Sequence, residues 1–433
     1  STTHSGSGNS RTHTATITGA FTSGVSSDTA TNNILLKAQH DTDATKAVTL
    51  NGATGMGITQ KGTGKPVLFG GRRWYGNGVA GRTINGLGFQ PDLLWGKDRD
   101  DTNWPIIVDS VRGAHNNNDR VLYPNEANAN DNPGGGDTFS GFEKDGFELG
   151  ANTRLNDGSR AFVAWAWKAG GSVGSGTNAT SNGQFRINGE TTDRTATSYS
   201  VTGSGYAYGK SSGGTDYKAS YNVDAGFAII NTTSSGTGAA NTFPTFVGSP
   251  DWILLKNTTA SSSWGLYHSS GPVNGNYKKS AYLDLDIAFG TDTNVFGEIS
   301  TIGANSGRTW DVGSWSGSNG GSGSRHIYYI WKAVPGVSAF GTYDGQGTPK
   351  TITTGFAPRF LLIKRTNATS NWFLVDAFRG ADATGQLYFE AESNAVEQSS
   401  STLTATLDST GFTTQTHAGI NTSGGTYVYM AFA

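Results

Sequence analysis

An internal repeat, present three times, constrains this chain more than any other feature of its sequence. Residues 88–97 align with residues 355–364: each begins Gly-Phe-x-Pro, continues through an apolar run and ends in Lys. Both copies then reach a Trp and close on Val-Asp-x-x-Arg-Gly-Ala, whose last Ala comes 26 positions after the first Gly in each copy. A third, more divergent copy occupies residues 250–256 and 264–267. A block that occurs three times predicts three structural units of one kind.

The downstream ends of the three units also match. They are the aromatic segments 162–168, 327–332 and 427–433, which end 71, 76 and 69 residues after the lysine of their own copy. The continuous apolar run before each lysine predicts a strand buried on both faces, with the Trp-containing segment as its hairpin partner. The alternating aromatics of the end segments predict sandwich strands with one face in the core.

Composition favours short strands joined by tight turns. The chain has 63 Gly but also 11 Trp, 16 Tyr and 21 Phe, so it has enough apolar surface to fold. We predict an all-β fold of tandem antiparallel, jelly-roll-like β-sandwich repeats at 71–170, 221–336 and 337–433. Residues 1–70 are expected to form a β arm or small β module, and 171–220 a Gly/Ser-rich connecting segment.

Charge and cysteine content exclude several functions. The net charge is −2, and the longest basic runs are Arg72-Arg73 and Lys278-Lys279, which argues against nucleic-acid binding. Without cysteine there are no disulfides, no thiolate chemistry and no cysteine-based zinc sites. No segment approaches the ~20 apolar residues of a membrane span, so we expect no membrane insertion.

Several segments of the sequence show a family resemblance. It is carried by residues 225–230, 250–257, 264–268, 340–345, 353–358, 362–366 and 371–372. Together these resemble the repeat units of tail-fibre and other structural proteins of tailed bacteriophages, over roughly residues 75–433. The resemblance brings no catalytic residues and no cofactor.

The resemblance implies a virion structural protein, made in the host cytoplasm and found in the extracellular particle. We expect a tail fibre or appendage that contacts the host surface, with other virion proteins and a host glycan or receptor as partners. A homo-oligomer, guessed to be a trimer, follows from the habit of phage fibres. Residues 1–70 lie outside the resemblance and are expected to encode attachment to the particle.

Three other functions stay open. A capsid decoration or head-fibre protein would occupy the head shell, and a tailspike depolymerase would degrade host polysaccharide. A bacterial surface-layer or filament adhesin is the third.

Several catalytic-looking motifs fail on their context. Residues 170–174 and 209–213 match the serine-hydrolase elbow pattern but lie in Gly/Ser-rich sequence instead of a strand-to-helix turn. Residues 62–65 resemble a phosphate loop, but Pro66 replaces the Ser/Thr that would bind magnesium. Residues 98–103 have calcium-like oxygen spacing, and we interpret them as a solvated hairpin turn.

The histidines and carboxylates give no clear site either. The seven histidines are too scattered for a metal site and are expected at the surface or in turns: His4, His13, His40, His115, His268, His326 and His417. Two carboxylate pairs, Asp284 with Asp286 and Glu390 with Glu392, leave a glycosidase open, although edge-strand polar positions explain them better. Asp109–Arg112 and Asp376–Arg379 recur in two repeats, which favours a structural salt bridge or turn clamp. We predict that the chain is not an enzyme.

The tryptophans divide into core and candidate surface residues. Trp165, Trp167 and Trp331 lie on the end strands and are expected in the core. A packing role is also expected for Trp104, Trp264 and Trp372, which recur at the same repeat position. Trp310 and Trp315 show no counterpart in the other copies, and we predict these two as glycan contacts.

Overall fold

The structure is a computed structural model in which the chain divides into two units, Ser1–Pro66 and Val67–Ala433. It describes residues 2–5, 12–15, 67–112, 120–129, 138–173, 181–187, 190–198, 201–234, 241–292, 294–382, 385–403 and 406–433. In the first unit, β1 (Thr2–Ser5) pairs antiparallel with β2 (Thr12–Ala15). Residues 16–66, including the phosphate-loop-like stretch at 62–65, lie outside the described residues.

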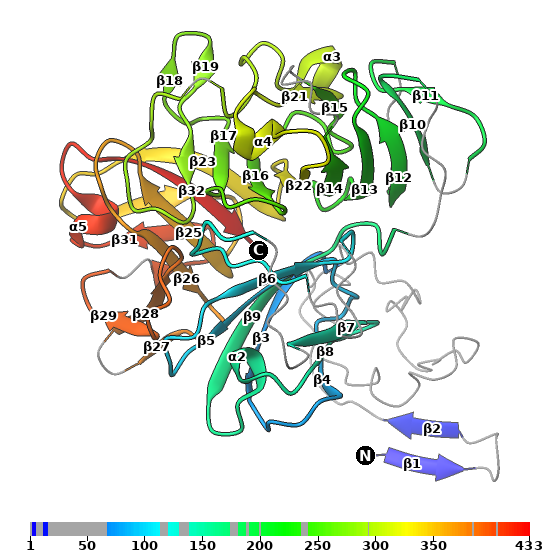
Figure 1. The fold of residues 1–433 in the computed structure, drawn as a ribbon. Coiled ribbons are helices and arrows are strands. Elements are labelled where there is room, and N and C mark those ends of the chain that lie inside the picture. The colour runs from blue at the N-terminus through cyan, green and yellow to red at the C-terminus, as the bar shows by residue number, and fades with distance from the viewer. Residues whose placement is uncertain are drawn as a thin grey trace, which may run out of the picture. The chain divides into compact units, whose positions relative to one another are not determined.

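The second unit contains three two-layered repeats, here called repeat 1 (67–173), repeat 2 (181–334) and repeat 3 (335–433) (Figure 1). In each, a main sheet contains the C-terminal strand of the repeat, and a smaller second layer covers one face of that sheet. In repeat 1 the main sheet has the order β3 (Phe69–Tyr75), β9 (Ala161–Trp167), β5 (Leu93–Asp98), β6 (Ile106–Asp109). Its second layer has the order β4 (Arg82–Asn85), β8 (Gly146–Leu149), β7 (Phe139–Glu143).

Repeat 3 follows the same plan. Its main sheet has the order β23 (Ser338–Asp344), β32 (Thr426–Phe432), β25 (Phe360–Arg365), β26 (Trp372–Asp376), β28 (Gly385–Glu390), β27 (Ala381–Asp382), and β29 (Gln398–Ser400) also pairs with β28. The second layer has the order β24 (Lys350–Thr353), β31 (Gly411–Thr414), β30 (Thr406–Leu407).

Repeat 2 keeps the plan and extends it. Its main sheet contains strands equivalent to those of the other repeats, in the order β14 (Phe227–Thr233), β22 (Arg325–Trp331), β16 (Trp252–Asn257), β17 (Gly265–His268), β20 (Ala281–Tyr282). Four strands are added beside β14: β13 (Asp216–Asn222), β12 (Ser204–Lys210), β10 (Gln184–Ile187) and β11 (Arg194–Thr195). The second layer is β15 (Thr242–Pro244) with β21 (Thr309–Asp311), and β18 (Val273–Asn274) pairs separately with β19 (Tyr277–Lys278).

These added strands lie largely within the connecting segment expected at 171–220, whose sequence is compatible with hairpins of its own. Its Gly/Ser-rich turns are short, and the residues between them alternate buried and exposed side chains, as Tyr217, Lys218 and Ala219 do in β13. That alternation is what a sheet with one covered face requires. The described strands of this segment therefore belong to the main sheet of repeat 2.

The all-β expectation is confirmed. All paired strands of the described residues are antiparallel, and helices there are limited to four single turns: α2 (Thr153–Asn156), α3 (Ala304–Gly307), α4 (Ser316–Asn319) and α5 (Ala418–Asn421). Within the same residues, no helix has the length and apolar character needed to cross a bilayer.

The two faces of each main sheet belong to different hydrophobic cores. On β9, Trp165 and Trp167 face a core shared by all three repeats, whereas Phe162 and Ala164 face the second layer of repeat 1. The strands β22 and β32 divide their side chains in the same way. The end strands were expected to bury one face. That expectation is wrong, because their other face packs against the neighbouring repeats.

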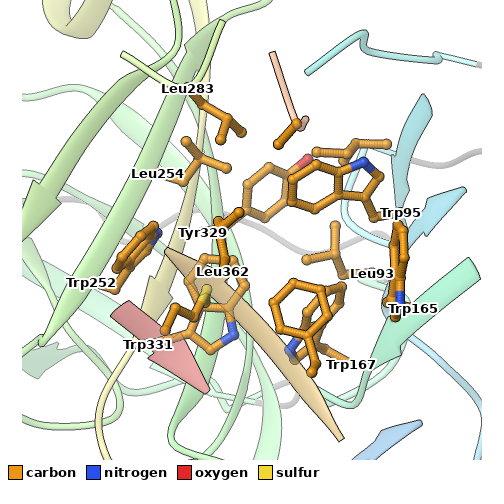
Figure 2. Close-up of a cluster of buried hydrophobic side chains, with 14 of the residues drawn as sticks. Leu93, Trp95, Trp165, Trp167, Trp252, Leu254, Leu283, Tyr329, Trp331 and Leu362 are labelled. Carbon is orange, nitrogen blue, oxygen red and sulfur yellow. The ribbon is translucent and has the colours of Figure 1, made fainter. Parts of the chain in front are cut away.

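The shared core is rich in aromatic contacts between repeats (Figure 2). Phe69 stacks on Phe432 at 5.0 Å between ring centroids, and Trp167 meets Trp331 edge-on at 6.0 Å. Trp252 meets Trp372 at the same distance. A void of only about 20 Å³ remains among these side chains. Burial of each such ring contributes about 1.5–3 kcal/mol to the stability of the fold. The three repeats therefore stabilise one another and are not independent domains.

Candidate functional site

One lysine from each repeat joins that repeat to a neighbour. Lys97, Lys256 and Lys364 are the next-to-last residues of the strands β5, β16 and β25. Each donates to the backbone carbonyl six residues further on and so closes its own turn. Each also donates to a carbonyl of another repeat: Lys97 to Asn394 (3.0 Å), Lys256 to Ala127 (2.8 Å) and Lys364 to Asp286 (2.7 Å). The lysine of repeat 1 thus donates a hydrogen bond to repeat 3, that of repeat 3 to repeat 2, and that of repeat 2 to repeat 1. We call this arrangement the lysine cycle.

Burial changes the electrostatics of these lysines. Removal from water lowers the pKa of Lys97, Lys256 and Lys364 to about 8, with nearby carboxylates opposing the shift. A buried ammonium needs acceptors for its protons, and the two carbonyls supply them. The three lysines therefore act as fixed connectors between repeats.

A second set of contacts involves the residue twelve positions after each lysine. In repeat 1 this is Asp109, which is fully buried and accepts from Arg112 Nε (2.5 Å) and from the Tyr329 hydroxyl of repeat 2 (2.8 Å). In repeat 3 it is Asp376, which accepts from Arg379 Nε (2.5 Å) and from Trp165 Nε1 of repeat 1 (3.1 Å). The expected Asp–Arg salt bridges are present, and each also contacts a neighbouring repeat.

Repeat 2 has His268 at this position, and its chemistry differs accordingly. The imidazole is fully buried, and its Nδ1 accepts from the Ser270 backbone N–H (3.0 Å). Nε2 therefore carries the hydrogen and faces the Tyr429 carbonyl of repeat 3 at 3.3 Å. Burial lowers the pKa of His268 to about 4, so the ring is neutral near pH 7.

Burial of two histidines corrects one expectation. His268 and His326 are 0% and 1% exposed, not surface residues. His326 Nε2 accepts from the Gly320 N–H, and desolvation lowers its pKa to about 4. His417 caps α5 through Nδ1, whereas His40 and His115 lie outside the described residues.

The two carboxylate pairs contain the same repeat position. Asp284 and Glu392 each follow a buried Trp by twenty residues and accept its backbone N–H, from Trp264 at 2.8 Å and Trp372 at 3.0 Å. Burial raises the pKa of Asp284, and it raises that of Glu392 to about 7. Asp286 contributes its backbone carbonyl to the lysine cycle. Asp284 and Glu392 thus each stabilise a turn in their own repeat.

Repeat 1 departs from this pattern for a simple reason. Counted from the lysines, Trp372 is equivalent to Pro105, not to Trp104. Pro105 has no N–H to donate, and the carboxylate position holds Asn125, whose Oδ1 finds no partner among the described residues.

The expectation of one shared Trp position is therefore corrected for Trp104. Trp264 and Trp372 are fully buried, and their indole N–H groups donate to carbonyls of neighbouring repeats, Tyr123 at 2.8 Å and Tyr282 at 3.0 Å. Trp104 is half-buried and meets the Tyr123 ring edge-on at 5.0 Å within its own repeat.

The structure contradicts the predicted glycan contact at Trp310, whereas the one at Trp315 stays a prediction. Trp310 is 0% exposed and lies in the core of repeat 2 beside Phe243 and Tyr328, so its ring face is not accessible to a sugar. Its place in β21 is that of Phe147 in β8 and Phe412 in β31, which are the missing counterparts. Trp315 precedes α4 and is partly buried against the same core, and its ring makes a T-shaped contact with that of Tyr282 at 5.8 Å between centroids.

The remaining motifs have structural roles. Lys210 and Ser211 belong to the β12–β13 hairpin, where Ser211 donates to Asn241 in a buried contact. Residues 170–173 follow β9, and Gly174 lies outside the described residues. The Asp98 carboxylate accepts the N–H groups of Asp100 and Asp101 and so closes the turn. Among the described residues, no group of three or more His, Asp or Glu is placed to hold a metal.

One recurrent residue escaped the sequence reasoning. Each repeat has a single helical turn that ends in a buried Asn: Asn156 in α2, Asn319 in α4 and Asn421 in α5. Asn421 Nδ2 donates to the carbonyls of Thr348 and Gln415, and Asn156 makes the equivalent pair of contacts. The available signal was an Asn eleven or twelve residues before the last aromatic of each end strand.

Comparisons with known proteins return one family. A sequence profile described as "Domain of unknown function (DUF7483)" matches residues 68–217 and 181–433. Neither a curated protein nor a solved structure matches the chain.

Proposed function

The chain belongs to the DUF7483 family, and from that premise we propose that it is a non-enzymatic structural protein of a tailed-bacteriophage virion. In this proposal it forms a tail fibre or appendage that contacts the host surface. Its partners are other virion proteins and a host glycan or receptor. The motifs at 88–97, 250–256 and 355–364 support the virion assignment through their resemblance to phage repeats.

The observation that carries the proposal is the use made of the buried ionisable groups. Lys97, Asp109, His268 and Asp376 all have partners inside the protein, and each is in contact with a second repeat. Catalytic acids and bases must instead face a substrate within hydrogen-bond reach. Contacts of this kind suit a rigid structural protein that holds its shape without disulfides.

The test is the place of the protein on the particle. Antibodies against the purified chain, coupled to gold, should label the tails of purified virions in electron micrographs. Label on the head would favour a decoration protein, and particles without the chain would contradict the proposal altogether. Purified protein should release no reducing sugar from host capsule or lipopolysaccharide, whereas a tailspike depolymerase would.

The proposed oligomeric state has its own measurement. Light scattering with size separation should give about three times 45.3 kDa for the homotrimer. A value of 45.3 kDa would mean that the threefold cycle inside one chain replaces association between chains.

A further inference from the structure

Repeat 2 contains a pocket of about 190 Å³ on the side of its added strands. One wall comes from the added segment and includes Phe185, Val201 and Val223. The other walls are two loops beside the second layer, residues 244–248 and 306–308. The described residues of repeats 1 and 3 form no strands equivalent to β10–β13, so the pocket belongs to repeat 2.

Hydrogen bonds fix the two loops relative to each other. The Thr245 N–H donates to the Arg308 carbonyl (2.9 Å), and the Thr245 hydroxyl donates to the Gly307 carbonyl (2.6 Å). Gly307 permits the close approach, because a Cβ there would lie 2.7 Å from the Ser249 nitrogen. The pocket is therefore formed before any ligand arrives.

Backbone strain concentrates at this pocket. Phe246, Asn305 and Ser306 have φ values of 60°, 53° and 62°, in the left-handed region that side chains with a Cβ disfavour. They are three of the four such residues other than glycine in the described part of the chain. Strain of this kind costs about 1–3 kcal/mol per residue and clusters at ligand sites.

The chemistry of the lining favours an anion with an apolar body. Among the described residues of the lining, Arg308 is the one charged residue, there is no Asp or Glu, and Ser306 is also present. Arg308 Nη1 donates to the Thr197 carbonyl at 3.3 Å, which holds the guanidinium at this side of the repeat. The backbone N–H groups of Phe246 and Val247 donate to no acceptor among the described residues. Phe246 and Gly248 have positive φ on either side of Val247, an alternation typical of backbone concavities that bind anions. The rest of the lining is mainly apolar.

We propose that this pocket binds a small organic carboxylate, with the carboxylate at Arg308 and the loop 246–247, and the ligand body against Val201 and Val223. Two sources share this chemistry: an acidic sugar of a surface polysaccharide and a free short-chain acid. The sugar source rests on the proposed host-contact function, whereas binding of the carboxylate itself does not.

The experiment compares charged probes with their uncharged counterparts on the full chain. Saturation-transfer NMR and calorimetry would use methyl glucuronide against methyl glucoside, and butyrate against butanol. At least one carboxylate probe should bind at least about tenfold more tightly than its neutral counterpart. Selective binding of the glucuronide identifies the sugar source, and selective binding of butyrate identifies a free acid.

Two variants and a matched control localise the binding. Arg308→Gln removes the cation and should weaken carboxylate binding by about tenfold. Val201→Phe fills the pocket from its partly exposed wall and should abolish binding while the melting temperature stays close to that of the parent. Arg325→Gln, an exposed arginine of the same repeat, should bind as the parent does.

The outcomes that would overturn the proposal are distinct from those for the virion assignment. No binding of either carboxylate, equal binding of the neutral counterparts, or equal binding by the Arg308→Gln and Arg325→Gln variants would each reject the pocket. Gold labelling of virions depends on none of these measurements. Either proposal can therefore fail while the other holds.

Discussion

Repeats 1 and 3 differ from repeat 2 at the same buried position, and the difference follows from the neighbouring strand. Asp109 faces the hydroxyl of Tyr329, and Asp376 faces the indole N–H of Trp165. The equivalent end-strand residue that repeat 3 offers to His268 is Met430, which has no strong donor. There the acid is replaced by a neutral imidazole that uses the adjacent backbone carbonyl.

The comparison teaches that the repeat conserves a geometry and adapts its chemistry. The side chain twelve residues after each lysine has to pair with the hydrogen-bonding groups that the neighbouring repeat places against it, because unsatisfied polar groups are costly in a shared core. A buried acid is retained where both an arginine and a donor are available. Repeat 2 has Gly271 three residues after His268, where the other two repeats have an arginine.

The largest expected effect on stability comes from breaking the buried Asp376–Arg379 pair of repeat 3. Arg379→Met leaves Asp376 charged and buried, and it also removes the contact of Arg379 with Glu397, which joins repeat 3 to Arg99 of repeat 1. We expect a loss of about 3–5 kcal/mol in the free energy of unfolding, measured by denaturant titration. Arg365→Met, which removes a surface arginine bonded only to Asn367, should cost less than about 0.5 kcal/mol. Equal losses in the two variants would refute the buried-pair interpretation.

The neutral His268 in repeat 2 should make the stability of the protein depend on pH. His268 has a folded pKa of about 4 and an ordinary value of 6.5, so between these values the unfolded chain binds more protons. Stability should therefore fall as the pH drops from 6.5 toward 4, by up to about 1.4 kcal/mol per pH unit for this group. His268→Gln should flatten the dependence of the melting temperature on pH over that range. An unchanged slope would show that His268 does not titrate as its burial requires.

The lysine cycle provides a test of what the repeats have in common. Lys364→Met removes donors from the Asp286 and Ser370 carbonyls at the contact between repeats 3 and 2, and should cost about 1–3 kcal/mol. The control Lys350→Met loses one exposed contact with the Asp344 carbonyl and should stay within about 0.5 kcal/mol. A result for Lys364→Met inside the control range would remove the lysines from the account of how repeats join.

The smallest effect is expected in the part unique to repeat 2. Ser306→Gly relieves a left-handed backbone and should raise stability by up to about 1 kcal/mol, seen as a higher melting temperature. Ser314→Gly is the matched control, since Ser314 is exposed with a negative φ and should lose stability on the same change. Destabilisation by both would mean that the strain at Ser306 is compensated by contacts of its side chain.

The strands were predictable from the sequence, but their partners were not. The apolar run before Lys97 correctly indicated burial on both faces, since no polar residue interrupts it until the lysine. The same pattern cannot say whether a face is covered by a second layer or by another repeat, and so the shared core was missed. Trp104 lies seven residues after its lysine, whereas Trp264 and Trp372 lie eight after theirs, and residue identity alone does not reveal this offset.

The candidate sites failed for related reasons. Trp310 looked unique because its counterparts are phenylalanines, yet strand position assigns all three to one structural role. His268 was expected at the surface or in a turn, although counting twelve residues from Lys256 places it at the buried position of Asp109. The pocket depends on strained loops that are distant in sequence, and no local pattern marks them.

Covalent fusion of the three repeats has a genetic consequence. In an assembly of three identical chains, every substitution appears at three equivalent places, and an insertion in one copy is an insertion in all. Here β10–β13 were added to a single copy while the lysine cycle of all three was kept. Among the described residues, the strands beside the pocket at Arg308 have no equivalent in repeats 1 and 3, so the ligand proposed for it would bind with a stoichiometry of one per chain.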